Sequence, residues 1–167
     1  NFRDFLISVG VKRWRLFTVF PAGRAALDNQ LNLSSMQFKE LMEFIAGTRR
    51  EGKIEVSYGC EGFLGGYEAE VRKSFYSCHA GVTVASVLAD GSISGCPSIR
   101  ANFYQGNIYR DSFMDVWNNG FGKFRDRSWA KTGICKDCRQ FRYCLGNGMH
   151  LRDEKDRLMF CHYQKLR

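Results

Sequence analysis

The sequence predicts an α+β protein that divides into two domains, residues 1–59 and residues 60–167. In the first domain, helical and strand patterns alternate, which is typical of consecutive βα units. In the second, glycine is frequent, and Asp90-Gly91 between apolar runs is a strong hairpin signal. The chain has seven cysteines, an odd number that fits metal ligation better than a closed set of disulfides. We therefore expect βα units followed by a small cysteine-rich domain with a β-hairpin and short helices.

The first helix and strand of the chain are predicted from local patterns. Apolar residues recur at helical spacing from Phe2 to Val9, and Gly10 ends the pattern. Residues 14–20 are rich in aromatic and β-branched side chains and predict a buried strand. Residues 21–24, which contain proline and glycine, end that strand.

A second helix and strand follow. Ser34 and Gln37 have the spacing of a capping box, and an apolar stripe then runs to about Arg50. Gly52 ends this helix, and residues 54–58 predict another strand. Two strands and two helices cannot close a barrel, so we expect the earlier units of such a structure to be missing from this chain.

The second domain is predicted to begin with a hairpin. Residues 82–84 and 87–89 have strand character, and the return strand after Gly91 is expected to continue to Cys96. Two short elements are expected downstream, an extended segment at residues 106–108 and a helix capped by Asp111 or Ser112.

Composition and charge narrow the classes of function. The net charge is +8, but lysine and arginine are scattered and form no arginine-rich run, so nucleic acid is not an expected partner. No apolar stretch is long enough to span a membrane, and no secretory signal is recognisable. We expect a cytoplasmic protein in a reducing compartment, where thiols remain available as ligands.

The cysteines fall into groups. Cys135 and Cys138 form a C-x₂-C pair, which places two thiols on one side of a tight turn. Cys144 follows after five residues and Cys161 after sixteen more. Upstream cysteines bracket or precede the hairpin: Cys60, Cys78 and Cys96. Spacing alone leaves structural zinc and an iron–sulfur cluster equally open.

The full cysteine pattern resembles the SPASM domain, the C-terminal extension of many radical S-adenosylmethionine (SAM) enzymes. Cys78, twelve residues, Gly91, four residues and Cys96 resemble the first half of its motif, and the C-x₂-C-x₅-C run with Cys161 resembles the second. The segment before residue 60 looks like the last βα units of the partial (β/α)₆ barrel of that family. The chain is similar to peptide- and protein-modifying maturases such as anaerobic sulfatase-maturating enzymes.

The resemblance implies one or two auxiliary [4Fe–4S] clusters. One would be bound by a complete set of four cysteines: Cys135, Cys138, Cys144 and Cys161. The other would use Cys78 and Cys96, with Cys60 as an uncertain third ligand. The family has a further cysteine where this chain has Gly148. Side chains that could stand in for it are His79, Asn147 and His150.

The resemblance also shows what this chain lacks. No C-x₃-C-x₂-C motif, which binds the catalytic cluster in radical SAM enzymes, occurs in the sequence. We therefore expect a part of a longer enzyme that is not catalytic by itself. Its expected partners are a peptide or protein substrate, the missing N-terminal barrel with its SAM, and an electron donor such as flavodoxin or ferredoxin.

Two interpretations of the function of the second domain stay open. The first is an auxiliary cluster domain that supports electron transfer and substrate binding. The second is a zinc-stabilised interaction module without redox chemistry. Outside the cysteines, His162 is expected to be a surface or supporting group rather than a ligand. The carboxylates Glu61, Glu68 and Glu70 are expected to be solvated loop residues.

Overall fold

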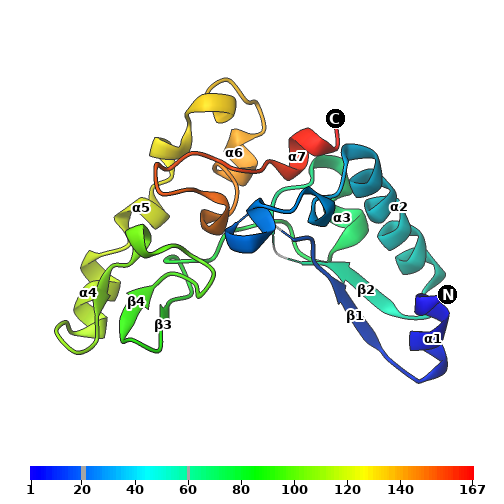
Figure 1. Ribbon diagram of the computed structural model, residues 1–167, viewed down its shortest axis with the longest axis horizontal. Coiled ribbons are helices and arrows are strands. Elements are labelled where there is room, and N and C mark those ends of the chain that lie inside the picture. The colour runs from blue at the N-terminus through cyan, green and yellow to red at the C-terminus, as the bar shows by residue number, and fades with distance from the viewer. Residues whose placement is uncertain (20–21, 60) are drawn as a thin grey trace. The chain divides into compact units, whose positions relative to one another are not determined.

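The computed structural model describes residues 1–19, 22–59 and 61–167. The chain forms two compact units, unit 1 with Asn1–Tyr76 and Phe160–Arg167, and unit 2 with Ser77–Met159 (Figure 1). Each unit combines short helices with a small sheet, so the predicted α+β class is confirmed. No sheet of the described residues closes into a barrel. The predicted domain boundary after residue 59 stays a prediction. Within the described ranges, no helix is both long and apolar enough to cross a bilayer.

Among its described residues, unit 1 has four α-helices and two strands: α1 (Phe2–Ser8), β1 (Arg13–Leu16), α2 (Ser35–Glu51), β2 (Glu55–Tyr58), α3 (Glu68–Val71) and α7 (His162–Lys165). Short 3₁₀ helices, η1 (Gly23–Ala26), η2 (Asn29–Leu31) and η3 (Gly65–Tyr67), lie in its connections. The predicted N-terminal helix is present as α1, and Gly10 follows it with a φ of +80°. None of the α1 side chains is buried.

Helix α2 is the element that local sequence determines most completely. The Ser34 hydroxyl accepts a hydrogen bond from the Gln37 amide, and the Gln37 side chain accepts one from the Ser34 amide, so the predicted capping box is confirmed. At the other end, Gly52 adopts a left-handed conformation with a φ of +72°, which glycine tolerates best. The apolar stripe of the helix packs against β2 (Figure 1).

Strands β1 and β2 pair in parallel, from Arg13 opposite Glu55 to Leu16 opposite Tyr58. Helix α2 connects them, as in a βαβ unit. The prediction of a buried strand over residues 14–20 is wrong in length and burial, since β1 ends at Leu16 and Phe17 is 58% exposed. The reason is that β1 has a single neighbour that is equally short, so later residues find no partner strand. Phe20 and Pro21 lie outside the described residues.

The hydrophobic core of unit 1 lies between α2, the two strands, α3 and the C-terminal segment that contains α7. Its buried members are Phe38, Met42, Ile45, Ala46, Val56, Tyr58, Leu64 and Val71. Four of them come from α2. Full burial of one such apolar side chain stabilises the folded state by about 1.5–3 kcal/mol, so this helix face contributes a large part of the stability of unit 1.

Unit 2 is built from much shorter elements: β3 (Ser86–Val87), β4 (Ser92–Ser94), β5 (Gly106–Asn107), α4 (Phe113–Asn119), α5 (Gly122–Arg125) and α6 (Phe141–Cys144). Its 3₁₀ helices are η4 (Ala101–Phe103), η5 (Ser128–Ala130), η6 (Gly133–Cys135) and η7 (Met149–Leu151). The three strands form one antiparallel sheet in the order β3-β4-β5. The predicted extended segment is present as β5, and α4 begins after Ser112, whose hydroxyl caps it.

The predicted hairpin is present with one correction. Gly91 has a φ of +81° in the turn between β3 and β4, as the Asp90-Gly91 pair predicts. The strand expected over residues 82–84 is wrong. The backbone amides of these residues donate to the carbonyl of His79, which closes a turn and leaves a single bridge between Ala80 and Val84.

The core of unit 2 is aromatic and depends on close approach of backbone. Its buried members are Ala80, Ile93, Ile99, Phe103, Phe121, Phe124 and Met149. A Cβ atom on Gly95 would lie 2.6 Å from the Phe124 ring and 3.0 Å from the backbone nitrogen of Gly81. Because neither contact leaves room for a methyl group, glycine at this position lets the chain leaving β4 pack directly on the ring.

Candidate metal centre

The C-x₂-C pair lies in a tight turn, as the sequence predicts. Cys135 ends η6, and its amide donates to the carbonyl of Thr132 at 2.9 Å. The amide of Cys138 in turn donates to the carbonyl of Cys135 at 3.3 Å. Gly133 starts the turn with a φ of +52°. This local backbone folds the two cysteines back toward each other over three residues.

Helix α6 follows this turn directly, and the third cysteine lies at its end. The amide of Phe141 donates to the carbonyl of Cys138 at 3.1 Å, and Cys144 is the last residue of the helix. The next residues reverse the chain, since Leu145, Gly146 and Asn147 all have positive φ. Cys144 therefore stands at a helix end followed by a sharp backbone reversal.

The electrostatics of Cys135 show that these three thiols are close enough to influence one another. Cys135 is 6% exposed, and this burial raises the pKa of its thiol. The guanidinium of Arg152 opposes the rise, whereas the thiols of Cys144 and Cys138 add to it. Metal binding at such a site would release the thiol protons, because the thiolate is the ligand.

The fourth predicted ligand, Cys161, belongs to unit 1. It occupies the N-terminal cap position of α7 and is half-buried. The helix that follows is held in place by Lys165, whose ammonium donates to the carbonyl of Leu33. The next residue, His162, is 1% exposed and packs against the rings of Phe38 and Phe160.

The second predicted set of ligands lies on the aromatic core of unit 2. Cys78 and Cys96 are half-buried, and both pack against the cluster that contains Met149. Gly148, the residue at the family's cysteine position, directly precedes Met149 and is buried. The structure thus brings both cysteines and the neighbour of Gly148 to one hydrophobic cluster. Cys60 lies outside the described residues.

Of the proposed substitutes for the absent cysteine, His79 has a side-chain contact, whereas Asn147 and His150 accept hydrogen bonds through their backbone carbonyls. The ring nitrogen Nδ1 of His79 lies 3.0 Å from the Thr83 hydroxyl. Asn147 is 2% exposed, and its backbone carbonyl accepts from Arg127 at 2.8 Å. The carbonyl of His150 accepts from Arg100 at 3.5 Å.

The donor set fits a thiolate-bound centre by its chemistry. No disulfide joins any two of the described cysteines, so none of their thiols is consumed by a disulfide. Over the described ranges, no three side chains of histidine, cysteine, aspartate or glutamate gather closely enough to hold a single metal ion. A buried guanidinium beside Cys135 supplies positive charge where thiolates would carry negative charge.

Comparison with known families assigns this region. Residues 78–139 match the SPASM family, described as an iron–sulfur cluster-binding domain. This segment is a SPASM domain. The match includes four of the predicted ligands, Cys78, Cys96, Cys135 and Cys138, and it ends before Cys144 and Cys161. SPASM domains are typical of radical SAM enzymes. No curated protein matches the chain, and no solved structure matches it.

Outside the SPASM segment, unit 1 contains a buried polar network that sequence reasoning missed. Glu61 is 9% exposed, and its carboxylate accepts hydrogen bonds from the Thr18 amide at 3.1 Å and the Thr18 hydroxyl at 2.6 Å. The Tyr58 hydroxyl also donates to it, and the His162 ring nitrogen Nε2 lies 3.7 Å away. Burial raises the pKa of Glu61, but the bonds from His162, Thr18 and Tyr58 outweigh burial and lower it.

This network corrects one prediction and narrows another. Glu61 is not a solvated loop carboxylate, and of the two alternatives given for His162, a surface group is excluded and a supporting group is left. Glu61 and His162 are buried because of where the strands end. Thr18 follows β1, Tyr58 ends the adjacent parallel strand β2, and their hydroxyl groups both contact the Glu61 carboxylate. Burial lowers the pKa of His162, partly offset by Glu61. A glutamate just after a strand, with a hydroxyl at the end of the paired strand, is the signal that could have identified the network.

The other two carboxylates differ from each other. Glu68 is 5% exposed and accepts from the amides of Leu64 and Tyr76, both at 2.8 Å, while pairing with Arg72 at 3.2 Å. The prediction of a solvated side chain is therefore wrong for Glu68. Glu70 has a 52% exposed side chain, as predicted. Both belong to α3, but they lie on different faces of it.

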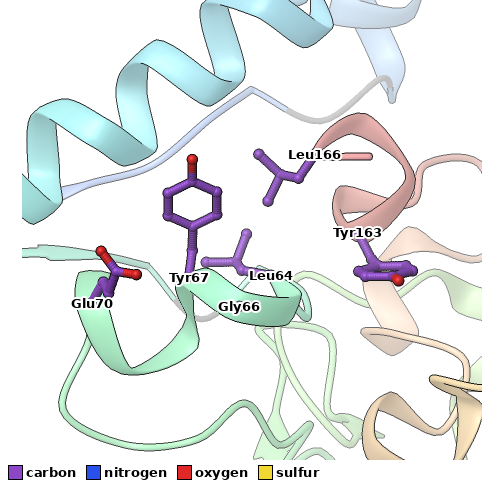
Figure 2. Close-up of a pocket in the computed structure, with 6 residues that line it drawn as sticks. All are labelled: Leu64, Gly66, Tyr67, Glu70, Tyr163 and Leu166. Atoms are coloured by element: carbon purple, nitrogen blue, oxygen red, sulfur yellow. The ribbon is translucent and has the colours of Figure 1, made fainter.

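Unit 1 also has an open depression of 220 Å³ between η3, α3 and α7. Figure 2 shows its lining: Leu64, Gly66, Tyr67, Glu70, Tyr163 and Leu166. The Tyr67 hydroxyl donates a hydrogen bond to the Glu43 carboxylate at 3.4 Å. The lining contains no cysteine and no histidine, so this depression shares no residue with the candidate metal centre.

Proposed function

We propose that this chain supplies auxiliary [4Fe–4S] cluster binding to a radical SAM enzyme that modifies a peptide or protein. The SPASM segment carries this proposal. The turn that contains Cys135 and Cys138, and the electrostatic influence of Cys144 on Cys135, support it from the structure.

The chain's own residues would perform three tasks in this role. Cys135, Cys138, Cys144 and Cys161 would hold one cluster. The aromatic core beside Cys78 and Cys96 would limit water at the second site. The backbone reversal after Cys144 would fix the direction of that thiol. A bound cluster would supply one-electron transfer and, where an iron is open, a site for a substrate group.

The second site is proposed to be incomplete. Cys78 and Cys96, two of its proposed ligands, pack against one hydrophobic cluster, and Cys60 is the proposed third ligand. With Gly148 in place of a cysteine, one iron would remain open to a substrate atom. This would make the second site the one that contacts substrate and the first the one that only transfers electrons.

Unit 1 is proposed to be the end of a partial (β/α)₆ barrel. Support comes from the parallel pairing of β1 with β2 through α2. The full enzyme would then bring SAM and its catalytic cluster on preceding βα units. Flavodoxin or ferredoxin is the proposed electron donor, in the cytoplasm.

A zinc-stabilised interaction module is the second candidate. The C-x₂-C turn favours it, because two thiolates on one tight turn also suit tetrahedral zinc. In that case the cysteines would stabilise unit 2 without taking part in electron transfer.

Metal analysis separates the two candidates. After anaerobic expression and reconstitution, the 167-residue chain should contain iron and acid-labile sulfide. Stoichiometric zinc without sulfide would refute the cluster proposal and establish the zinc module.

Single cysteine variants test the ligand sets. Cys144→Ala should remove one cluster's worth of iron and leave the other site, whereas Cys78→Ala should affect the other site alone. Iron content that is unchanged in Cys144→Ala would refute the first set. Cys60→Ala should lower iron content only if Cys60 is the third ligand of the second site.

A further inference from the structure

Two arginine side chains are buried in unit 2, and the one carboxylate of the described residues that is known to act on either of them, that of Asp156 on Arg152, is itself paired with Lys123. Arg152 is 1% exposed and Arg127 is 5% exposed. Within the described part of the chain, neither guanidinium forms an ion pair with a carboxylate. Arg100, by contrast, is partly exposed and pairs with Glu154 at 3.2 Å. Burying a cation without a directly paired anion is costly, so further negative charge beside these two arginines would stabilise them.

The hydrogen bonds of Arg127 and Arg152 use only some of the N–H donors of each guanidinium group. Arg152 donates to the carbonyls of Gly146 at 2.6 Å and Asp156 at 2.9 Å, and Arg127 donates to that of Asn147 at 2.8 Å. The Nε atom of each side chain is buried and has no hydrogen-bond partner among the described residues. Carbonyl dipoles position these groups, but they do not neutralise two full charges.

The group next to this charge is the thiol of Cys135. Arg152 interacts with Cys135 both through charge and through a side-chain contact, and Arg127 is near enough to repel Arg152. Both guanidinium groups also lie over the ring of Trp129, at 5.6 Å for Arg127 and 5.4 Å for Arg152. Two like charges are thus held together on one aromatic ring beside a predicted ligand.

The backbone is fitted to this arrangement. A Cβ atom on Gly146 would lie 2.5 Å from the guanidinium of Arg152 and 2.8 Å from the side chain of Ala130. Gly146 also has a φ of +79°, which disfavours other residues. The reversal that follows Cys144 therefore closes onto Arg152 only because its second residue lacks a side chain.

A purely structural role does not explain why neither buried guanidinium forms a direct ion pair within the described residues. Arg125 shows what such a role looks like in the same unit. It donates to the carbonyls of Gly81 and Trp117 and stacks on the Trp117 ring at 5.0 Å, but it is exposed, so water screens its charge. Arg127 and Arg152 have no such screening.

We propose that Arg152 and Arg127 are the counter-charge of an anionic cluster held at Cys135, and that they favour its one-electron reduced state. The proposal rests on the proposed function. Reduction by an external donor adds one electron, and hence one negative charge, to the cluster. A fixed, buried positive charge stabilises the more negative state, so the arginines raise the reduction potential. They are positioning residues and not ligands.

The test measures the reduction potential of the first cluster in arginine variants. The reconstituted chain is titrated anaerobically with dithionite, and the reduced cluster is followed by electron paramagnetic resonance. Arg152→Met should lower the potential by about the equivalent of a tenfold change in the reduced-to-oxidised ratio, which is about 59 mV for a one-electron couple. Arg152→Lys, which keeps the charge, should restore most of the shift.

Two further variants complete the design. Arg127→Met should shift the potential in the same direction by a smaller amount, and it carries the test if Arg152→Met does not fold. Arg125→Met is the matched control and should leave the potential unchanged, because Arg125 contacts the carbonyls of Gly81 and Trp117 and the Trp117 ring, and its exposed charge is screened by water.

The outcomes separate this proposal from the one on which it rests. Wild-type protein without iron and sulfide would overturn the proposed function and this inference together. Wild-type protein with a cluster whose potential is the same in Arg152→Met and Arg127→Met would overturn this inference alone. A shift in Arg125→Met equal to that in Arg152→Met would also overturn it, because the effect would then be one of general stability.

Discussion

The two units of this protein are stabilised in different ways. Unit 1 is organised by α2, a helix of 17 residues whose apolar face covers a parallel strand pair. Unit 2 has strands of two or three residues and no helix longer than 7 residues. Its aromatic core depends on glycines that let backbone approach the rings, and two buried arginines lie beside its cysteines.

The difference indicates which unit would gain more stability from a bound metal. Periodic secondary structure lets unit 1 bury an apolar face from one continuous segment. Unit 2 gains little from such periodicity, because elements this short are not stable alone. Metal ligation by its cysteines would add folding free energy that unit 1 obtains from helix packing.

Metal removal should therefore have the largest effect, and it should act on unit 2. Loss of a structural metal costs on the order of 10 kcal/mol in small metal-stabilised domains. After chelation under anaerobic conditions, hydrogen exchange at the amides of Phe124 and Arg125 in α5 should accelerate by about a hundredfold or more. Amides in α2 serve as the internal control and should change little. Equal loss of protection in both units would show that the metal stabilises the molecule as a whole.

The next effect should fall on unit 1. Glu68→Gln would remove the carboxylate that pairs with the buried Arg72 and accepts two backbone amides. Breaking a buried ion pair by removing one partner costs about 3–5 kcal/mol, which urea unfolding followed by circular dichroism would measure.

Glu70→Gln is the matched control for that change, since Glu70 lies in the same short helix with an exposed side chain. It should alter the free energy of unfolding by less than about 0.5 kcal/mol. If both variants lost the same amount, the buried bonds of Glu68 would not be the cause.

A smaller effect is expected in the core of unit 2. In Gly95→Ala, the added methyl group would meet the Phe124 ring at 2.6 Å. Overpacking of this kind costs about 1–3 kcal/mol. Gly122→Ala is the control, because nothing lies within 4 Å of its Cβ position, and it should be neutral or slightly stabilising in thermal unfolding. A neutral Gly95→Ala would mean that the aromatic core shifts to accept the group.

The sequence predicted those features that short stretches of chain determine. The Ser34 cap, the Gly52 terminus and the Asp90-Gly91 turn each depend on a few adjacent residues, and all three are present. The turn of the C-x₂-C pair has the same origin. The strand prediction for residues 82–84 is wrong. Valine and threonine favour a strand locally, but hydrogen bonds from these residues to the carbonyl of His79 close a turn instead.

The features that sequence did not predict depend on distant partners. Glu61 becomes buried because Thr18, Tyr58 and His162 surround it. The return of Phe160–Arg167 to unit 1 likewise depends on packing against residues such as Phe38. Arg152 beside Cys135 has no signal in sequence, because one arginine resembles any other until the fold places it. The ligand sets themselves stay a prediction.

The smallest effect is expected where stability is most local. Ser34→Ala would remove the hydroxyl that accepts from the Gln37 amide at 3.2 Å and caps α2. Loss of such a cap costs about 1 kcal/mol. Ser35→Ala, one residue further into the helix and also exposed, should change the free energy of unfolding by less than about 0.5 kcal/mol. Because the cap stabilises α2, and α2 packs against β2, hydrogen exchange should accelerate in α2 and β2 and remain unchanged in the sheet β3-β4-β5. Equal acceleration in that sheet would show that the two units unfold together. The units would then differ in their secondary structure but not in their stability.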